Sequence, residues 1–126
     1  IDIGAKTTGT IAGNVGETIT IGTAASYIWY KFIAEANRKY KVKIYQMIST
    51  KYLYYVFAVD SNNVIKGLYA PKPSVEGEYT HELTVPNGAT HLMVMSNYLH
   101  DPVVTTKDIY DLQSQIADID ARFEGV

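Results

Sequence analysis

The run YLYYVFAVD, residues 52–60, is the most continuously apolar stretch of the chain. Aromatic and β-branched residues favour extended structure, and apolar residues at successive positions are typical of a strand that is covered on both faces. The run ends at DSNN, residues 60–63, whose residue types favour a turn. The sequence therefore predicts a central strand at residues 52–60, around which the other strands assemble.

Further strand patterns lie on both sides of this run. The clearest before it are residues 26–34 and 40–45, and those after it are residues 64–69, 79–85 and 91–97. Clusters rich in glycine, proline or asparagine separate most of these segments, and none of the segments has the period of a helix. About eight strands at such spacing predict an all-β fold, an antiparallel sandwich.

The first 25 residues are rich in glycine, threonine, alanine and isoleucine. Two β-branched segments, residues 7–12 and 18–21, flank a glycine and asparagine cluster at residues 13–16. This pattern predicts two short strands joined by a tight turn. We expect residues 1–25 to be an N-terminal β-hairpin or entry segment, and residues 26–104 to be the β-sandwich domain.

The C-terminal segment has a heptad pattern. Apolar residues at alternating spacings of three and four are Ile109, Leu112, Ile116, Ile119 and Phe123. This pattern predicts an α-helical coiled-coil stem over residues 105–126, with Thr105 or Thr106 as the N-cap. Two heptads are marginal alone, so the preceding domain or a longer coiled coil must help. Isoleucine at a with leucine or isoleucine at d favours a homotrimer over a dimer.

Composition limits the functions that we expect. Without cysteine there is no disulfide, thiolate metal site or cysteine nucleophile. The net charge is −2, and the one dense basic stretch, residues 38–43, places its lysines on one face of a strand, so nucleic-acid binding is not expected. No apolar run approaches the roughly 18 residues that span a bilayer. The N-terminus lacks a signal-peptide pattern, so the chain resembles part of a longer protein.

The titratable residues do not form a catalytic motif. His81, His91 and His100 lie on separate predicted strands or loops, and ordinary surface or core roles are favoured for them. The alternative is that His81 and His91 bind a metal from neighbouring strands. The glutamates of residues 76–82 have the spacing of a solvated rim rather than of a glycosidase pair. We therefore expect no enzyme activity, no cofactor and no metal.

Aromatic residues supply the candidate binding site. Alternation places Tyr27 and Trp29 on the outward face of one strand, Tyr45 on that of another, and Tyr54 on the less apolar side of the central run. A sugar stacks its C–H face on an aromatic ring and bonds its hydroxyls to polar neighbours, so these four residues predict a glycan site. The alternative is packing against another subunit, the stem or an adjacent domain, and subunit contact is favoured for the methionines of residues 91–97.

The segment TVPNGATHLMV, residues 84–94, resembles the closing strands of galactose-binding-like jelly rolls, the fold of many carbohydrate-binding modules. Residues 30–32, 39–42 and 55–65 look like parts of such modules in tail fibres of phages and prophages of gut bacteria and in bacterial surface proteins. The resemblance covers residues 26–97 and implies a jelly-roll sandwich. Such modules often precede a coiled coil and a further domain, which is sometimes a hydrolase.

These carbohydrate-binding modules commonly carry a structural calcium ion. The ligand residues of such a calcium site have no residue-by-residue match in this sequence. The oxygen-rich cluster that could supply ligands is Asp60, Asn62 and Asn63. We expect a non-catalytic structural or adhesion module of an oligomeric extracellular or phage tail-fibre protein, on a cell or virion surface, that binds surface glycans. The alternative is an accessory domain of a carbohydrate-active or esterase-type hydrolase whose catalytic domain lies outside these residues.

Overall fold

The computed structural model describes residues 1–106, which form antiparallel sheets and contain no helix. The strands are β1 (Thr7–Thr8), β2 (Thr10–Ala12), β3 (Thr20–Gly22), β4 (Tyr27–Ile33), β5 (Lys39–Gln46), β6 (Tyr54–Val59), β7 (Ile65–Pro71), β8 (Gly77–Thr84), β9 (His91–Asn97) and β10 (Val103–Thr106). The predicted all-β class is confirmed for this part of the chain. The predicted stem residues from Ile109 to Phe123 lie outside it.

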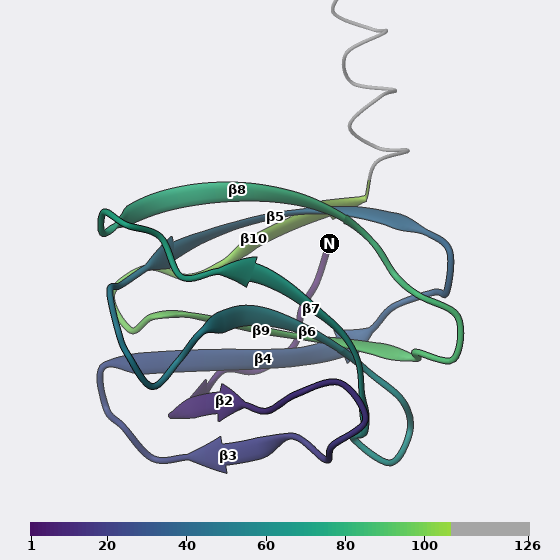
Figure 1. Ribbon diagram of the computed structural model, residues 1–126. Helices are drawn as coiled ribbons and strands as arrows, with labels where there is room; N and C mark the ends of the chain where they lie inside the picture. The colour runs from purple at the N-terminus through teal and green to yellow at the C-terminus, as the bar shows by residue number, and fades with distance from the viewer. Residues whose placement is uncertain (107–126) are drawn as a thin grey trace, which may run out of the picture.

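The strands form three sheets, which are stacked as layers in Figure 1. The large sheet has the order β1-β4-β9-β6-β7, and the small sheet has the order β10-β5-β8. The third layer is the hairpin of β2 and β3, which lies against the other face of the large sheet. The arrangement of the large and small sheets is consistent with a β-sandwich, to which the hairpin adds a layer.

Strand β6 is an internal strand of the large sheet, between β9 and β7. Its residues from Tyr55 to Val59 are all buried, as expected for a strand that is covered on both faces. The prediction from the apolar run is confirmed. Strand β9, which lies beside β6, is also buried on both faces, apart from the half-buried His91 at its start.

The core between the large and small sheets follows the alternation of the sequence. Alternation along residues 26–34 and 40–45 predicts which side chains of β4 and β5 face inward, and these are all buried: Ile28, Tyr30, Phe32, Tyr40, Val42 and Ile44. Phe32 of β4 contacts Tyr40 of β5 with ring centroids 6.5 Å apart, which joins the two sheets. These inward-facing predictions are confirmed.

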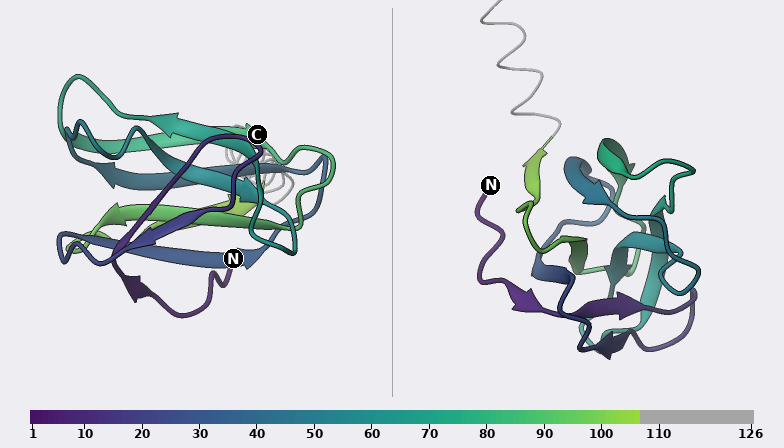
Figure 2. Two further views of the ribbon diagram at one scale, coloured as in Figure 1. Left: turned by 60° about the horizontal axis from the view of Figure 1, so that its bottom comes forward. Right: turned by 90° about the vertical axis from the view of Figure 1, so that its left-hand side faces the viewer.

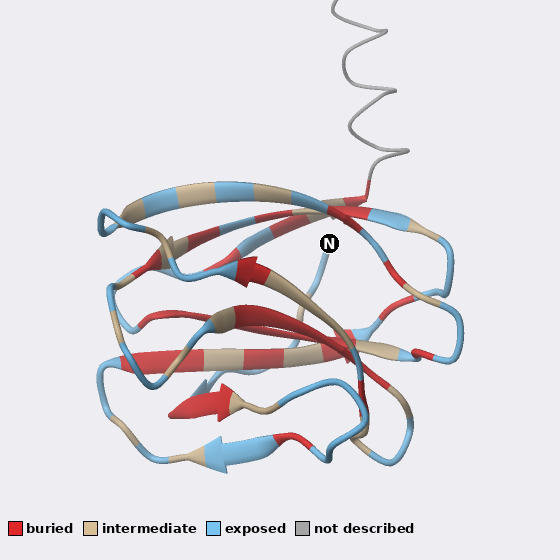
Figure 3. Ribbon diagram, viewed as in Figure 1, coloured by how far each residue is buried: buried red, intermediate tan, exposed pale blue. Residues whose placement is uncertain are grey.

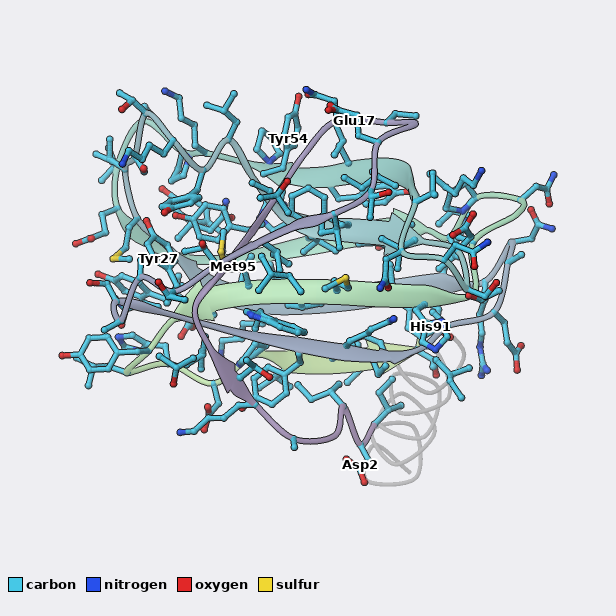
Figure 4. All side chains as sticks on the ribbon, turned by 90° about the horizontal axis from the view of Figure 1, so that it is seen from below. Asp2, Glu17, Tyr27, Tyr54, His91 and Met95 are labelled. Carbon is cyan, nitrogen blue, oxygen red and sulfur yellow. The ribbon has the colours of Figure 1, made fainter. Side chains whose placement is uncertain are left out.

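The N-terminal hairpin buries the opposite face of the large sheet. Ile11 is fully buried and Ile19 is 7% exposed, and both belong to the core cluster that includes Met93 and Met95. Figure 4 shows the N-terminal segment crossing this face near Met95, and Figure 3 shows how much of β6, β9 and β4 is buried. The favoured subunit contact for Met93 and Met95 is therefore wrong, because both side chains are in the core of one chain.

Backbone hydrogen bonds hold the hairpin in place at both ends. At one end, Gly9 N donates to Tyr27 O at 2.8 Å. At the other end, Ile19 N donates to Asn63 O at 2.9 Å, and Ile65 N donates to Glu17 O at 2.8 Å. These bonds join the hairpin to β4 and to the turn between β6 and β7, so the third layer is part of the hydrogen-bonded fold.

The described chain ends on the small sheet, far from the loop that follows β9. Strand β10 pairs with β5 so that Thr106 lies opposite Tyr40, near the start of β5. Thr105 and Thr106 are thus strand residues, and β10 includes the first two positions that the sequence assigned to the stem. The amino group of Ile1 donates to Val104 O at 2.8 Å, so the N-terminus lies beside β10, as Figure 2 shows.

Candidate functional site

The structure places the four predicted glycan-binding aromatics on different surfaces. Tyr27 and Trp29 belong to the large-sheet face that the hairpin covers. Tyr27 is 6% exposed and packs edge-on against Tyr52 with ring centroids 4.9 Å apart, so its predicted exposure is wrong. Trp29 is half-buried against the core, and its Nε1 is buried without a hydrogen-bond partner among residues 1–106. A platform built from these two rings is not present on the surface.

Tyr54 is half-buried at the start of β6. It lines a small cleft of about 140 Å³ together with residues of the hairpin turn and of the loop before β6: Ala12, Gly13, Asn14, Lys51, Leu53 and Phe57. This cleft lies against the third layer, so Tyr54 is separated from Tyr45, which is on the small sheet.

Tyr45 lies on the outer face of the small sheet, near the end of β5, and is half-buried. Its ring stacks on the exposed His100 with ring centroids 4.2 Å apart and an angle of 8° between the planes. The Tyr45 hydroxyl donates to Glu76 Oε2 at 3.3 Å. Partial desolvation and the Glu76 carboxylate raise the pKa of Tyr45, so the phenol is neutral at physiological pH. The three side chains come from three segments of the chain.

Ser96 fixes the backbone of both stacked residues. Its fully buried hydroxyl accepts a hydrogen bond from Tyr45 N at 3.0 Å and donates one to His100 O at 2.7 Å. On the far side of the loop, the Tyr30 hydroxyl donates to Asp101 Oδ1 at 3.0 Å. Support of this kind holds a surface group in one geometry before a ligand arrives, which reduces the entropy lost on binding.

Polar side chains continue from Tyr45 along the outer face of the small sheet. Lys43 is the next residue of β5 on this face, about 7 Å from Tyr45. Its ammonium pairs with Glu78 Oε1 at 3.1 Å. A hollow of about 240 Å³ follows, lined by Lys41, Lys43, Thr80, Val103 and Thr105. The outer face thus presents an aromatic pair, carboxylates, an ammonium group and hydroxyls in one continuous region.

The geometry does not support the alternative metal pair of His81 and His91. His81 is in β8 of the small sheet, opposite Val42, whereas His91 is in β9 of the large sheet, so the two are not on neighbouring strands. Within residues 1–106, no group of three or more histidine, cysteine, aspartate or glutamate side chains could hold a metal ion.

The oxygen-rich cluster at residues 60–63 forms a turn. Asp60 Oδ1 accepts hydrogen bonds from Asn62 N at 2.8 Å and Val64 N at 3.0 Å. These backbone bonds, with Lys66 nearby, hold the pKa of Asp60 below its ordinary value. Asn63 Oδ1 accepts from the Lys31 ammonium at 2.5 Å. The side-chain oxygens of Asp60 and Asn63 are therefore already bonded to protein donors.

Of the four aromatics predicted from the sequence, Tyr45 belongs to this candidate site, but the sequence did not point to the residues around it. His100 and Glu76 reach Tyr45 from distant loops, and no local pattern marks either of them. Ser96 could have been noticed, because it is a hydroxyl residue at a buried position of an apolar strand. No family model, curated protein or solved structure matches the chain. Among residues 1–106 there is no helix that could span a membrane.

Proposed function

We propose that the chain is a non-catalytic glycan-binding adhesion module, related to the galactose-binding-like jelly rolls, from an oligomeric extracellular or virion fibre protein. The binding site is the outer face of the small sheet around Tyr45 and His100. The observation that carries the proposal is the stacking of the Tyr45 and His100 rings. Ser96 supports this stack because its hydroxyl is hydrogen-bonded to the backbone of both residues. A fixed aromatic surface with polar neighbours suits a sugar ring.

Each part of this surface has a role in the proposed complex. The apolar C–H face of a sugar stacks on the exposed His100 ring, which Tyr45 supports from beneath. Sugar hydroxyls donate to the carboxylates of Glu76 and Glu78 and accept from the ammonium of Lys43. A few such contacts provide about 4 to 6 kcal/mol, so one site binds with a Kd in the millimolar to high-micromolar range.

Oligomerisation would compensate for this weak affinity. The described chain leaves the domain at Thr106, beside Tyr40, at the opposite end of β5 from Tyr45. A trimeric stem beyond Thr106 would leave the three Tyr45 surfaces free to face one glycan-coated target. Three sites that engage together raise avidity by roughly a hundredfold or more without a new contact.

A glycan array probed with the full chain tests the site. We expect Tyr45→Ala and His100→Ala to abolish binding, because each removes one ring of the stack. Tyr54→Ala is the matched control, since it removes another half-buried tyrosine from a different surface. Loss of binding in Tyr54→Ala together with normal binding in Tyr45→Ala would disprove the assignment and favour the cleft beside the hairpin.

Light scattering of the same chain tests the oligomer. We expect a trimer that Ile116→Asp dissociates into folded monomers, because a charge would be buried in the seam of the stem while the domain is untouched. The circular dichroism of the strands should remain unchanged. A monomeric wild-type chain at high concentration would contradict the proposed role of the stem.

A further inference from the structure

Lys31 and His91 lie together at the opposite end of the large sheet from Ser96. His91 is paired with Ile33 of β4, and Lys31 lies two residues before Ile33 on the same face. Both residues line an open hollow of about 540 Å³, together with Asp2, Ile3, Gly4, Phe32 and Ile33. Figure 4 shows His91 at this end of the sheet and Asp2 apart from it on the N-terminal segment. We call this region the Lys31 hollow.

The positive charge of Lys31 has no carboxylate partner among residues 1–106. Its ammonium donates to the neutral Asn63 Oδ1 at 2.5 Å, which uses one of its three protons. Asp2 does not neutralise it, because the Asp2 carboxylate forms no ion pair within this part of the chain and Oδ1 accepts from Gly4 N at 2.8 Å. Two donors of Lys31 are therefore available to a ligand.

His91 adds a further donor to the hollow. Its Nδ1 lies 2.8 Å from the hydroxyl oxygen of Thr90, and when this hydroxyl donates to Nδ1 the imidazole proton is on Nε2. Burial, and secondly the charge of Lys31, hold the pKa of His91 below its ordinary value. The Lys31 ammonium thus disfavours a positive charge on the neighbouring imidazole. A bound anion would offset this repulsion between the two side chains.

We infer that the Lys31 hollow binds a small monocarboxylate with an apolar body. The carboxylate oxygens accept from Lys31 Nζ and from the His91 imidazole, and the apolar body lies against Ile33 and Ile3. Ile33 is 78% exposed, so a ligand there would remove apolar surface from water. With His91 neutral, Lys31 supplies one positive charge beside it, and the Asp2 carboxylate elsewhere in the lining would repel a second negative charge, so the hollow matches a monoanion better than a dianion. This site is independent of the glycan site at Tyr45.

Nuclear magnetic resonance titration with 3-methylbutyrate and with its neutral amide tests the inference. We expect 3-methylbutyrate to shift the backbone signals of Lys31, Ile33 and His91, and to bind at least about fivefold more tightly than the amide, because only the carboxylate complements the ammonium. Equal affinity of the two compounds would overturn the proposal. This comparison uses the wild-type chain, so it does not depend on the folding of a variant.

Two variants and a second anion complete the test. Lys31→Gln should weaken 3-methylbutyrate binding by about fivefold to tenfold and leave the amide unaffected, and Lys43→Gln on the small sheet is the matched control. His91→Gln should weaken binding by a smaller factor. Unchanged binding in Lys31→Gln, or tighter binding of sulfate than of 3-methylbutyrate, would overturn the assignment to a monocarboxylate.

Discussion

The buried side-chain amide of Gln46 is hydrogen-bonded to the imidazole of His81 through Gln46 Oε1 and His81 Nε2. The other end of the amide, Gln46 Nε2, donates to Ala70 O at 3.1 Å and to Pro71 O at 3.0 Å. Because Nε2 of Gln46 is a donor in both of these bonds, its Oε1 must accept, and His81 carries its proton on Nε2. This network joins the small sheet to β7.

We predict that the free energy of unfolding falls as the pH decreases below about 6.5. Burial lowers the pKa of His81 from its ordinary value of 6.5, and burial lowers that of His91 in the same direction. The unfolded chain therefore binds more protons than the folded chain below pH 6.5, so stability decreases until the folded pKa values are passed. Urea denaturation at pH 7.5 and at pH 5.0 measures the difference.

His81→Asn is the control for this pH effect. An asparagine amide can still donate to Gln46 but does not titrate, so we expect a smaller decrease between pH 7.5 and pH 5.0 than in the wild-type chain. A wild-type free energy of unfolding that is constant or rises over this interval would contradict the prediction.

Gly9→Ala should destabilise the fold by several kcal/mol, whereas Gly16→Ala should cost only about 1 to 2 kcal/mol. Both glycines have positive φ, 139° at Gly9 and 91° at Gly16, but their surroundings differ. A Cβ on Gly9 would be 2.3 Å from Gly22 O, and a Cβ on Gly16 would meet nothing within 4 Å. Chemical denaturation of both variants measures the two effects: Gly16→Ala reports the backbone strain alone, and Gly9→Ala reports the strain together with the clash. Equal losses would show that the clash is relieved by movement of β3.

Ile11→Ala should cost about 2 to 5 kcal/mol, the usual range for a buried isoleucine, and Ile21→Ala should change stability by less than about 0.5 kcal/mol. The two isoleucines are register partners in the hairpin, yet Ile11 is fully buried and Ile21 is 54% exposed. The pair therefore compares one residue type within one element. A small loss in Ile11→Ala would mean that the hairpin contributes little to the core, contrary to the structure.

Trp29→Ala should lower stability by about 2 to 3 kcal/mol, less than for a fully buried tryptophan, because the ring is half-buried against the core. Trp29→Phe should cost less than half as much, because phenylalanine retains most of the packing and removes the buried Nε1 that has no partner within residues 1–106. Thermal unfolding measures both. Normal stability of Trp29→Ala, together with lost glycan binding, would restore Trp29 as a ligand residue.

Ser96→Ala should weaken glycan binding although Ser96 is fully buried and cannot touch a ligand. The change leaves Tyr45 N and His100 O without their partner, at a cost of about 1 to 3 kcal/mol, and loosens the stack. The ring-current shift of the His100 imidazole protons reports the stack directly. An unchanged shift together with lost binding would show that Ser96 does not act by positioning the two rings.

The sequence by itself determined most of the strand segments, although not β10, and it determined which side chains of β4 and β5 face the core between the two main sheets. Alternation along a strand is a local property, so the burial of Tyr30, Phe32, Val42 and Ile44 could be predicted correctly. The buried run of β6 was equally evident, because apolar residues at successive positions require cover on both faces.

Only the tertiary structure decided what covers the other face of the large sheet. Alternation shows that a strand has two different faces, but it does not show whether the second face meets water or another layer. Here the hairpin of β2 and β3 adds Ile11 and Ile19 to the core on this side, so Met95, which a two-layer sandwich would expose, is buried. Only the tertiary structure also decided which strands are neighbours in a sheet. The turn at residues 35–38 connects β4 and β5, which follow one another in the sequence but belong to different sheets.

The candidate site also depends on tertiary structure. Tyr45 and His100 are far apart in the sequence, and they stack because β5 of the small sheet ends beside the loop that follows β9 of the large sheet. The bond from Ser96 to both residues depends on the way in which the two sheets pack. Such contacts are set by the packing of many residues together, and no local pattern of residue types encodes them.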